Sequence, residues 1–235
     1  MSSEPTLTPA EFQKMVDDFF SVQCRYQAAI REIQTKLENL DDEFQMKHRR
    51  NPIHHMQSRM KTIRSMMEKL ERKHLQQSIT SAVDNLTDIA GIRVICSYLQ
   101  DVYAVADLLT SQDDVHVVKV RDYIKSPKSN GYRSLHLVVA VPVFFSNQKH
   151  QLPVEVQIRT TAQDYWAGLE HQLKYKQQVP DEADIVEQLR QCAETLAQTD
   201  LQMLAIRRRI EGSQPPATPE QVLREKVLRL DVAIE

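Results

Sequence analysis

The sequence predicts an α+β protein in which a β-sheet lies between long N- and C-terminal helices. From Phe12 to Phe44, apolar residues recur at steps of three and four, which is the period of an amphipathic helix. In residues 135–141 and 154–158 every second residue is apolar, which is typical of strands. From Ile185 to Leu204 the helical spacing returns.

The N-terminal third is expected to be helical. Its first helix begins at a capping box, Thr8 to Glu11, with a proline at the first helical position, and Asn51-Pro52 ends it. This long amphipathic helix would pack on the core or on another subunit. The sequence then favours a second helical stretch over residues 53–72 and a shorter one that ends near Asn85.

Strands and helices alternate in the centre of the chain. We expect a buried strand over 92–98, a capped helix over 101–110, a strand over 115–120, two longer strands and a helix over 161–175. A further helix is predicted over 181–211, then a Gly/Pro linker over 212–216 and a short helix or docking tail over 219–230. The predicted units are an N-terminal helical extension (1–50), a core (51–178), a C-terminal helix (179–211) and a linker with tail (212–235).

The composition is that of an ordinary water-soluble protein. The chain has 235 residues, 41% of them hydrophobic, and a net charge of −2. It contains no apolar run of the ~20 residues that a membrane helix needs and no signal-peptide core, so we expect a cytoplasmic protein without a membrane partner. Three separated cysteines, Cys24, Cys96 and Cys192, argue against a disulfide framework or a zinc site.

A basic stretch runs from Lys47 to His74, with nine Lys or Arg against two Glu, so it carries a charge of about +7. Such a stretch is most often a solvated helical face. The next interpretation is contact with a nucleic acid or another polyanion.

The strand around Glu155 carries three different hydrogen-bonding groups on one face. Because residues two apart in a strand point the same way, Glu155, Gln157 and Arg159 face opposite to Val154, Val156 and Ile158. A half-solvated sheet would give the same alternation. The alternative interpretation is that these three polar side chains bind a ligand together.

The preceding segment adds cations and an aromatic ring. Residues 123–132 are rich in Pro, Ser, Asn and Gly, so Lys125 and Lys128 lie on a loop that ends at Tyr132 and enters the strand of His136. Cations beside an aromatic ring suit a polyphosphate with a flat base. Tyr132 could instead be a core or rim aromatic, and His136 a hydrogen-bonded structural histidine.

Several strings resemble a known family in order and spacing. GYRSLH at 131–136, EVQIRT at 155–160 and the Trp166 to Lys176 run resemble the synthetase domain of RelA/SpoT proteins over roughly residues 45–210. More narrowly, the chain is similar to the small alarmone synthetases, and NGYRSLHLVVAVPVF is similar to their RelP/YwaC-like branch. The resemblance implies a nucleotidyltransferase-like fold with a mixed, largely antiparallel sheet. It also implies transfer of the pyrophosphoryl group of ATP to the 3′-hydroxyl of GDP or GTP, producing ppGpp or pppGpp and AMP.

The resemblance also implies roles for particular residues. Asp88, in the string DIAGIR, and Glu155 would hold Mg²⁺, since two hard oxygen donors suit this ion better than zinc. Glu155 is also the candidate general base. Standing alone, Asp88 could be a helix cap or a turn residue. The resemblance assigns the ATP side to Arg59, Lys61, Lys69, Arg93 and Arg121, and the GDP/GTP side to Lys125, Lys128, Tyr132, Arg133, His136, Gln157, Arg159 and Asp164.

Asp164 is a candidate for guanine selectivity. Guanine presents adjacent N1–H and N2–H₂ donors that a carboxylate accepts, whereas adenine has an acceptor at N1. Many relatives carry Asn at this position, and an Asp early in a helix also interacts favourably with the helix dipole.

The bifunctional relatives carry a His-Asp hydrolase motif, and no His-Asp dipeptide occurs here. We therefore expect synthesis without hydrolysis, no ribosome requirement and, by resemblance, a homotetramer. A nucleic-acid-binding module is an alternative, but it would leave Tyr132, Asp88 and Glu155 unexplained, so nucleic acid is not expected to be required. The other alternative is a relative without catalytic activity that acts only as a nucleotide sensor. Every catalytic position that matches the family is retained in this sequence, which argues against that alternative.

Overall fold

A five-stranded sheet forms the centre of the molecule. The computed structural model describes residues 8–48, 50–174 and 182–213, so the predicted tail over 219–230 lies outside it. The strands are β1 (Ile53–Met60), β2 (Ala90–Cys96), β3 (His116–Asp122), β4 (Leu135–Phe144) and β5 (Lys149–Thr160). Their order is β1-β2-β5-β4-β3, with β2 and β5 parallel and the other neighbours antiparallel. The predicted mixed, largely antiparallel sheet is confirmed.

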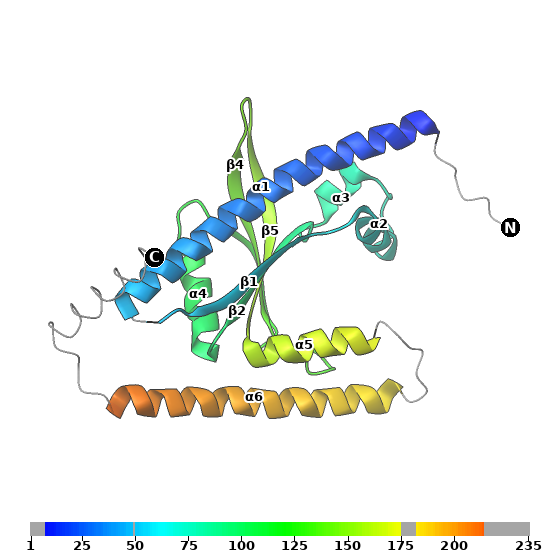
Figure 1. Ribbon diagram of the computed structural model, residues 1–235. Coiled ribbons are helices and arrows are strands. Elements are labelled where there is room, and N and C mark those ends of the chain that lie inside the picture. The colour runs from blue at the N-terminus through cyan, green and yellow to red at the C-terminus, as the bar shows by residue number, and fades with distance from the viewer. Residues whose placement is uncertain (1–7, 49, 175–181, 214–235) are drawn as a thin grey trace, which may run out of the picture.

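The helices are α1 (Pro9–His48), α2 (Ile63–Arg72), α3 (Ile79–Asn85), α4 (Leu99–Thr110), α5 (Thr161–Lys174) and α6 (Glu182–Ser213). The long first and last helices match the sequence prediction. Helix α1 crosses one face of the sheet, while α6 runs alongside α5 on the other side of the molecule (Figure 1). None of these helices is long and apolar enough to cross a membrane.

The core lies between α1 and the sheet because both contribute apolar residues to one cluster. Tyr26, Ile30, Ile33 and Leu37 follow the helical spacing and are almost completely buried. They share the cluster with the apolar residues of the central strands: Ile92, Val94, Leu137, Val139, Val154, Val156 and Ile158. Burying side chains of this size contributes about 1.5–3 kcal/mol each.

The prediction of one helical stretch over residues 53–72 is wrong in its first half. Ile53, Met56 and Met60 have helix-like spacing, yet residues 53–60 form the edge strand β1, paired along its length with β2. Backbone pairing with β2 outweighs this weak local pattern. The helix begins only after Thr62, whose side-chain oxygen accepts a hydrogen bond from Ser65 N at 3.2 Å.

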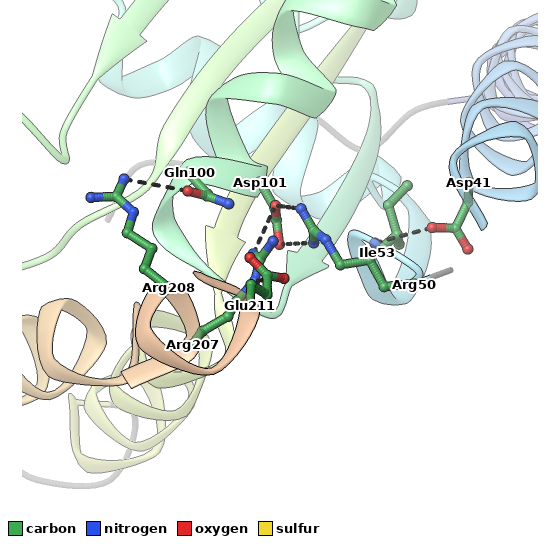
Figure 2. Close-up of polar contacts among 8 residues, drawn as sticks. All are labelled: Asp41, Arg50, Ile53, Gln100, Asp101, Arg207, Arg208 and Glu211. Carbon is green, nitrogen blue, oxygen red and sulfur yellow. Dashed lines mark hydrogen bonds and ion pairs between the residues drawn. The ribbon is translucent and has the colours of Figure 1, made fainter. Parts of the chain in front are cut away.

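The helix predicted over 101–110 is present, but the side-chain cap predicted for it is not. Helix α4 begins at Leu99 with Tyr98 as its N-cap, and no side chain caps it. Asp101 lies inside the first turn, is fully buried, and accepts two hydrogen bonds of 2.7 Å from Arg50. Arg207 of α6 approaches the same carboxylate (Figure 2). Asp101 therefore joins the segment that follows α1 and the last turns of α6 to α4.

Candidate active site

A row of polar residues crosses the sheet on the face opposite α1. The strand register places Gln57, Arg93, Gln157, His136 and Arg121 side by side on β1, β2, β5, β4 and β3. Residues paired in register point to the same face of a sheet. The neighbours of Arg93, Gln157 and His136 along their strands belong to the apolar core, so the polar row follows from the alternation of the three central strands.

A cavity of about 170 Å³ opens on this face. It is lined by Gln57, Arg59, Asp88, Gly91, Ile92, Arg93, Glu155 and Gln157. Asp88 and Glu155, which are far apart in the sequence, therefore line the same space. They meet because Asp88 lies just before β2, and β2 pairs in parallel with β5, with Gly91 opposite Glu155.

Asp88 is held by two lysines through one of its oxygens. Its Oδ2 lies 2.5 Å from Lys69 Nζ on α2 and 3.0 Å from Lys61 Nζ. Burial alone would raise the pKa of Asp88, but the hydrogen bond from Lys69 and the charge and hydrogen bond of Lys61 outweigh it, and the pKa lies below the ordinary value. The other oxygen, Oδ1, is buried without a hydrogen-bond partner. An ionised carboxylate with one unused oxygen can bind a cation at that atom.

Glu155 is oriented by its neighbours in the polar row. Its Oε2 accepts a hydrogen bond of 2.8 Å from Gln157, and its Oε1 lies 3.4 Å from His136 Nδ1. Burial alone would raise the pKa of Glu155, but these contacts outweigh it and the pKa is lowered. His136 Nε2 is in turn 2.8 Å from the Tyr132 hydroxyl. Tyr132, His136 and Glu155 thus form one hydrogen-bonded chain that fixes the carboxylate.

The predicted lysine loop packs beside this chain. Lys128 Nζ lies over the rings of Tyr132 and Tyr123, at 4.6 and 4.8 Å from their centroids. Lys125 lies 3.6 Å from Asp122 and over the ring of Tyr103. Of the two lysines, Lys128 therefore lies beside the chain formed by Tyr132, His136 and Glu155, whereas Lys125 lies against Asp122 and Tyr103.

Asp164, at the start of α5, pairs with two arginines. Its Oδ1 lies 3.2 Å from Arg159 Nε and 3.7 Å from Arg93 Nη1. Arg159 is almost completely buried, and burial lowers its pKa. The Asp164 side chain is still 36% exposed, so it remains accessible to a ligand. The sequence had placed Asp164 and Arg93 on different substrates, whereas the structure places them in contact.

The structure brings most, but not all, of the predicted residues together. Arg59, Asp88, Arg93, Glu155 and Gln157 line the cavity. Lys61, Lys69 and His136 contact residues that line it, and Tyr132 contacts His136. Arg121 is exposed on the edge strand, beside His136 in register. Arg133 lies apart, in a separate small void next to α6, where it donates a hydrogen bond to the Ile124 carbonyl.

Sequence reasoning missed two kinds of residue. Gln57 lines the cavity but was overlooked because β1 was taken for a helix. Tyr123 and Trp166 pack around Tyr132, with ring centroids 6.0 and 6.3 Å away. A strand interpretation of residues 53–60 would have aligned Gln57 and Arg59 on one face, and that is the signal that could have found Gln57.

Comparison with known proteins places the chain in a family. Residues 58–180 match the family model described as a region found in RelA / SpoT proteins. The GTP pyrophosphokinase YwaC of Bacillus subtilis is 36% identical over 201 residues, which cover 86% of this chain and 96% of YwaC.

Solved structures of small alarmone synthetases from Bacillus subtilis are also similar. Synthetase 2 superposes with a TM-score of 0.73 at 38% identity, covering 82% of this chain and 99% of that one. Synthetase 1 bound to its product pppGpp gives 0.75 at 31% identity, covering 83% and 99%, and its complex with AMPCPP gives 0.69 at 28%, covering 84% and 100%. The resemblance noted in the sequence is thereby confirmed, and the chain belongs to the RelA/SpoT family.

Proposed function

We propose that this protein is a (p)ppGpp synthetase that transfers the pyrophosphoryl group of ATP to the 3′-hydroxyl of GDP or GTP. The observation that carries the proposal is the shared cavity of Asp88 and Glu155, in a family member whose relatives are named GTP pyrophosphokinase. A relative bound to pppGpp and to AMPCPP supports a guanosine polyphosphate and an ATP-like nucleotide as ligands.

The ATP side is assigned to the cations around Asp88. Arg59 and Arg93 line the cavity and would enclose the adenine, while Lys61, Lys69 and Arg121 would bind the phosphates. Lys61 and Lys69 are within 3.0 Å of Asp88, so the phosphates would lie beside that carboxylate. Such positioning and charge neutralisation are the main requirements of phosphoryl transfer.

The acceptor side is assigned to the loop and the row beside Glu155. Tyr132 would stack on the guanine, and Lys125, Lys128 and His136 would bind acceptor phosphates. Gln157, Arg159 and Asp164 would contribute polar contacts, with Asp164 as the candidate for guanine N1–H and N2–H₂. Arg133 is proposed for the same side, although its place beside α6 suggests that it acts by supporting the loop.

Asp88 and Glu155 are suited to hold Mg²⁺. The Oδ1 atom of Asp88 is buried without a partner, and a second carboxylate lines the same cavity. Among the residues that the structure describes, no group of three or more His, Cys, Asp or Glu could hold a metal. Two carboxylates are sufficient, because Mg²⁺ usually takes one or two from the protein and the rest of its ligands from phosphates and water. When bound, the ion would neutralise polyphosphate charge.

Glu155 is the proposed general base. It would accept the proton of the acceptor 3′-hydroxyl while that oxygen attacks the β-phosphorus of ATP. The bond from the β-phosphorus to the oxygen that bridges it to the α-phosphorus breaks, and AMP leaves. The lowered pKa of Glu155 keeps it ionised at neutral pH, so its effect depends on placement, and His136 and Gln157 supply that placement.

The test is to incubate the purified protein alone with ATP, Mg²⁺ and GDP or GTP and to resolve the products by anion-exchange chromatography. We expect AMP and a guanosine tetra- or pentaphosphate in equal amounts, without ribosomes or nucleic acid. AMP without the alarmone would refute the proposal. Incubation with ppGpp should release no pyrophosphate, because we propose synthesis only.

We also propose a cytoplasmic homotetramer. The reaction uses ATP and GDP or GTP, which are cytoplasmic metabolites. Exposed apolar side chains of α6, Leu201, Met203, Ile206 and Ile210, favour burial against another subunit. Light scattering after size-exclusion chromatography should give four times the 27.2 kDa chain mass, and a monomer mass would contradict the proposal.

A further inference from the structure

The loop that carries Tyr132 rests directly on helix α6. Gly131 is buried and has a φ of 90°, in the region where glycine is favoured. A Cβ at this position would lie 2.7 Å from the Cβ of Ala193 and 3.0 Å from the Cα of Arg190, both on α6. The backbone at Gly131 therefore lies so close to the helix that it has no room for a side chain, and Ala193 contributes only a methyl group to the contact.

The turn around Gly131 is internally fixed. Gly131 N donates to the Lys128 carbonyl at 2.8 Å, and Lys128 N donates to the Tyr132 carbonyl at 3.2 Å. The Asn130 side chain accepts from Tyr132 N at 3.2 Å and donates to Glu170 of α5 at 3.0 Å. A displacement of Gly131 must consequently move Lys128 and Tyr132 with it.

Trp166 joins the same contact from α5. Its indole Nε1 donates to the Leu189 carbonyl of α6 at 2.9 Å, and its ring centroid lies 6.3 Å from that of Tyr132. Leu189 is one helical turn before Ala193. The position of this part of α6 is therefore transmitted to Tyr132 by two routes, through Gly131 and through Trp166.

Helix α6 is itself anchored along its length. The Thr160 hydroxyl, at the end of β5, donates to Asp200 at 2.6 Å. Near the end of α6, the Arg207 guanidinium lies over the Tyr98 ring, 4.6 Å from its centroid. Arg207 also approaches Asp101, which Arg50 binds as well (Figure 2). Because its later turns are fixed to the sheet and to α4, α6 is a firm support and cannot easily shift to accommodate the loop.

We propose that Ala193 of α6 is a positioning residue for the acceptor nucleotide. Its side chain determines how far the Gly131 turn lies from α6, and thereby the positions of Tyr132 and Lys128 relative to Glu155. The inference rests on the proposed function, because it takes Tyr132 and Lys128 as acceptor-binding groups. The proposal means that α6, which does not line the cavity, also affects the affinity for the acceptor nucleotide.

The first experiment replaces Ala193 with Leu, with Ala205→Leu as the matched control on an exposed position of the same helix. The larger side chain should push the turn outward. We expect the KM for GDP to rise on the order of tenfold, because a displaced Tyr132 would stack less well on the guanine. The KM for ATP and kcat at saturating GDP should stay within about twofold of the wild type. Ala205→Leu should change none of them.

A double-mutant cycle between Gly131 and Ala193 tests the same contact without relying on the folding of Ala193→Leu. Gly131→Ala should raise the KM for GDP because its new methyl group meets Ala193. The double variant Gly131→Ala with Ala193→Gly removes that clash and should recover part of the loss. Recovery is partial because the positive φ and the 3.0 Å contact with Arg190 remain. A double variant no better than Gly131→Ala, or an equal rise in both KM values, would overturn the inference.

Failure of the inference differs from failure of the proposed function. If the wild type forms no alarmone, the proposed function fails. In that case the equilibrium affinity of the wild type and of Ala193→Leu for a fluorescently labelled GDP still shows whether Ala193 positions the loop. If the wild type is active and Ala193→Leu binds GDP normally, only the positioning role is refuted.

Discussion

Replacing Glu155 with Gln tests the centre of the site with a minimal change of shape. Glutamine keeps the side-chain length and an oxygen that can accept the 2.8 Å hydrogen bond from Gln157. It removes the negative charge that faces His136 Nδ1 at 3.4 Å, and with it the capacity to accept a proton. Nucleotide binding should persist while turnover is lost.

The expected size follows from the proposed role of Glu155. General-base catalysis contributes typically about 10²–10⁴-fold, or roughly 3–5 kcal/mol of the barrier. Glu155 is also a proposed metal ligand, so we place the loss in kcat at about 10³-fold or more. The sheet should be unaffected, because Glu155 points away from the apolar cluster that contains its neighbours Val154 and Val156.

The assay measures initial rates of alarmone formation, and calorimetry with a non-hydrolysable ATP analogue and Mg²⁺ measures binding. Glu32→Gln, on an exposed position of α1, is the matched control for the loss of one carboxylate. A kcat within tenfold of the wild type would refute the base assignment. Loss of folding, seen as a lowered thermal unfolding midpoint, would refute the expectation that the effect is chemical.

Three further outcomes are expected. Tyr132→Ala should raise the KM for GDP by about 5- to 150-fold, the equivalent of ~1–3 kcal/mol of base stacking, with little change in the KM for ATP in steady-state kinetics. Asp101→Ala should lower the free energy of unfolding by about 3–5 kcal/mol, because it leaves Arg50 without its buried partner, and calorimetry should show the melting temperature lower by roughly 6–20 °C. The pKa of Asp88 is lower in the folded protein than its ordinary value of 3.8. The ionised Asp88 therefore contributes its full stabilisation above pH 3.8, and this contribution is lost as the pH falls from there through the lower pKa of the folded state. Lys69→Met should therefore reduce stability at pH 7 and flatten its decline below pH 3.8 in urea titrations.

The sequence predicted those parts of the fold that have a strong local period. Helix α1 was predicted because its buried positions, Tyr26, Ile30, Ile33 and Leu37, follow the helical spacing over many turns. Strand β1 was missed because it is an edge strand with only Ile53 fully buried, so its alternation is hardly visible. What makes it a strand is its pairing with β2, which no local pattern reveals.

The candidate site divides in the same way. Glu155, Tyr132 and His136 stand in short strings whose strand and loop character can be read locally, so their neighbourhood was predictable. The contact of Asp164 with Arg93 and Arg159 was not, because it depends on how α5 packs against the ends of β2 and β5. The contact between Gly131 and Ala193 joins segments far apart in the chain, and neither residue has a functional group that would mark it.

Gly91 shows how the strand register shapes the cavity. It lies between Arg59 and Glu155 in one row of the sheet, and a Cβ there would meet only Glu155 O at 3.6 Å and Arg59 Cγ at 3.9 Å, both ordinary contacts. Packing alone therefore does not require glycine. A side chain at this position would point into the space between the arginine and the carboxylate, on the face where both line the cavity. The strand register that brings β2 beside β5 thus also places a glycine between Arg59 and Glu155, and the open space between these two side chains follows from the missing side chain.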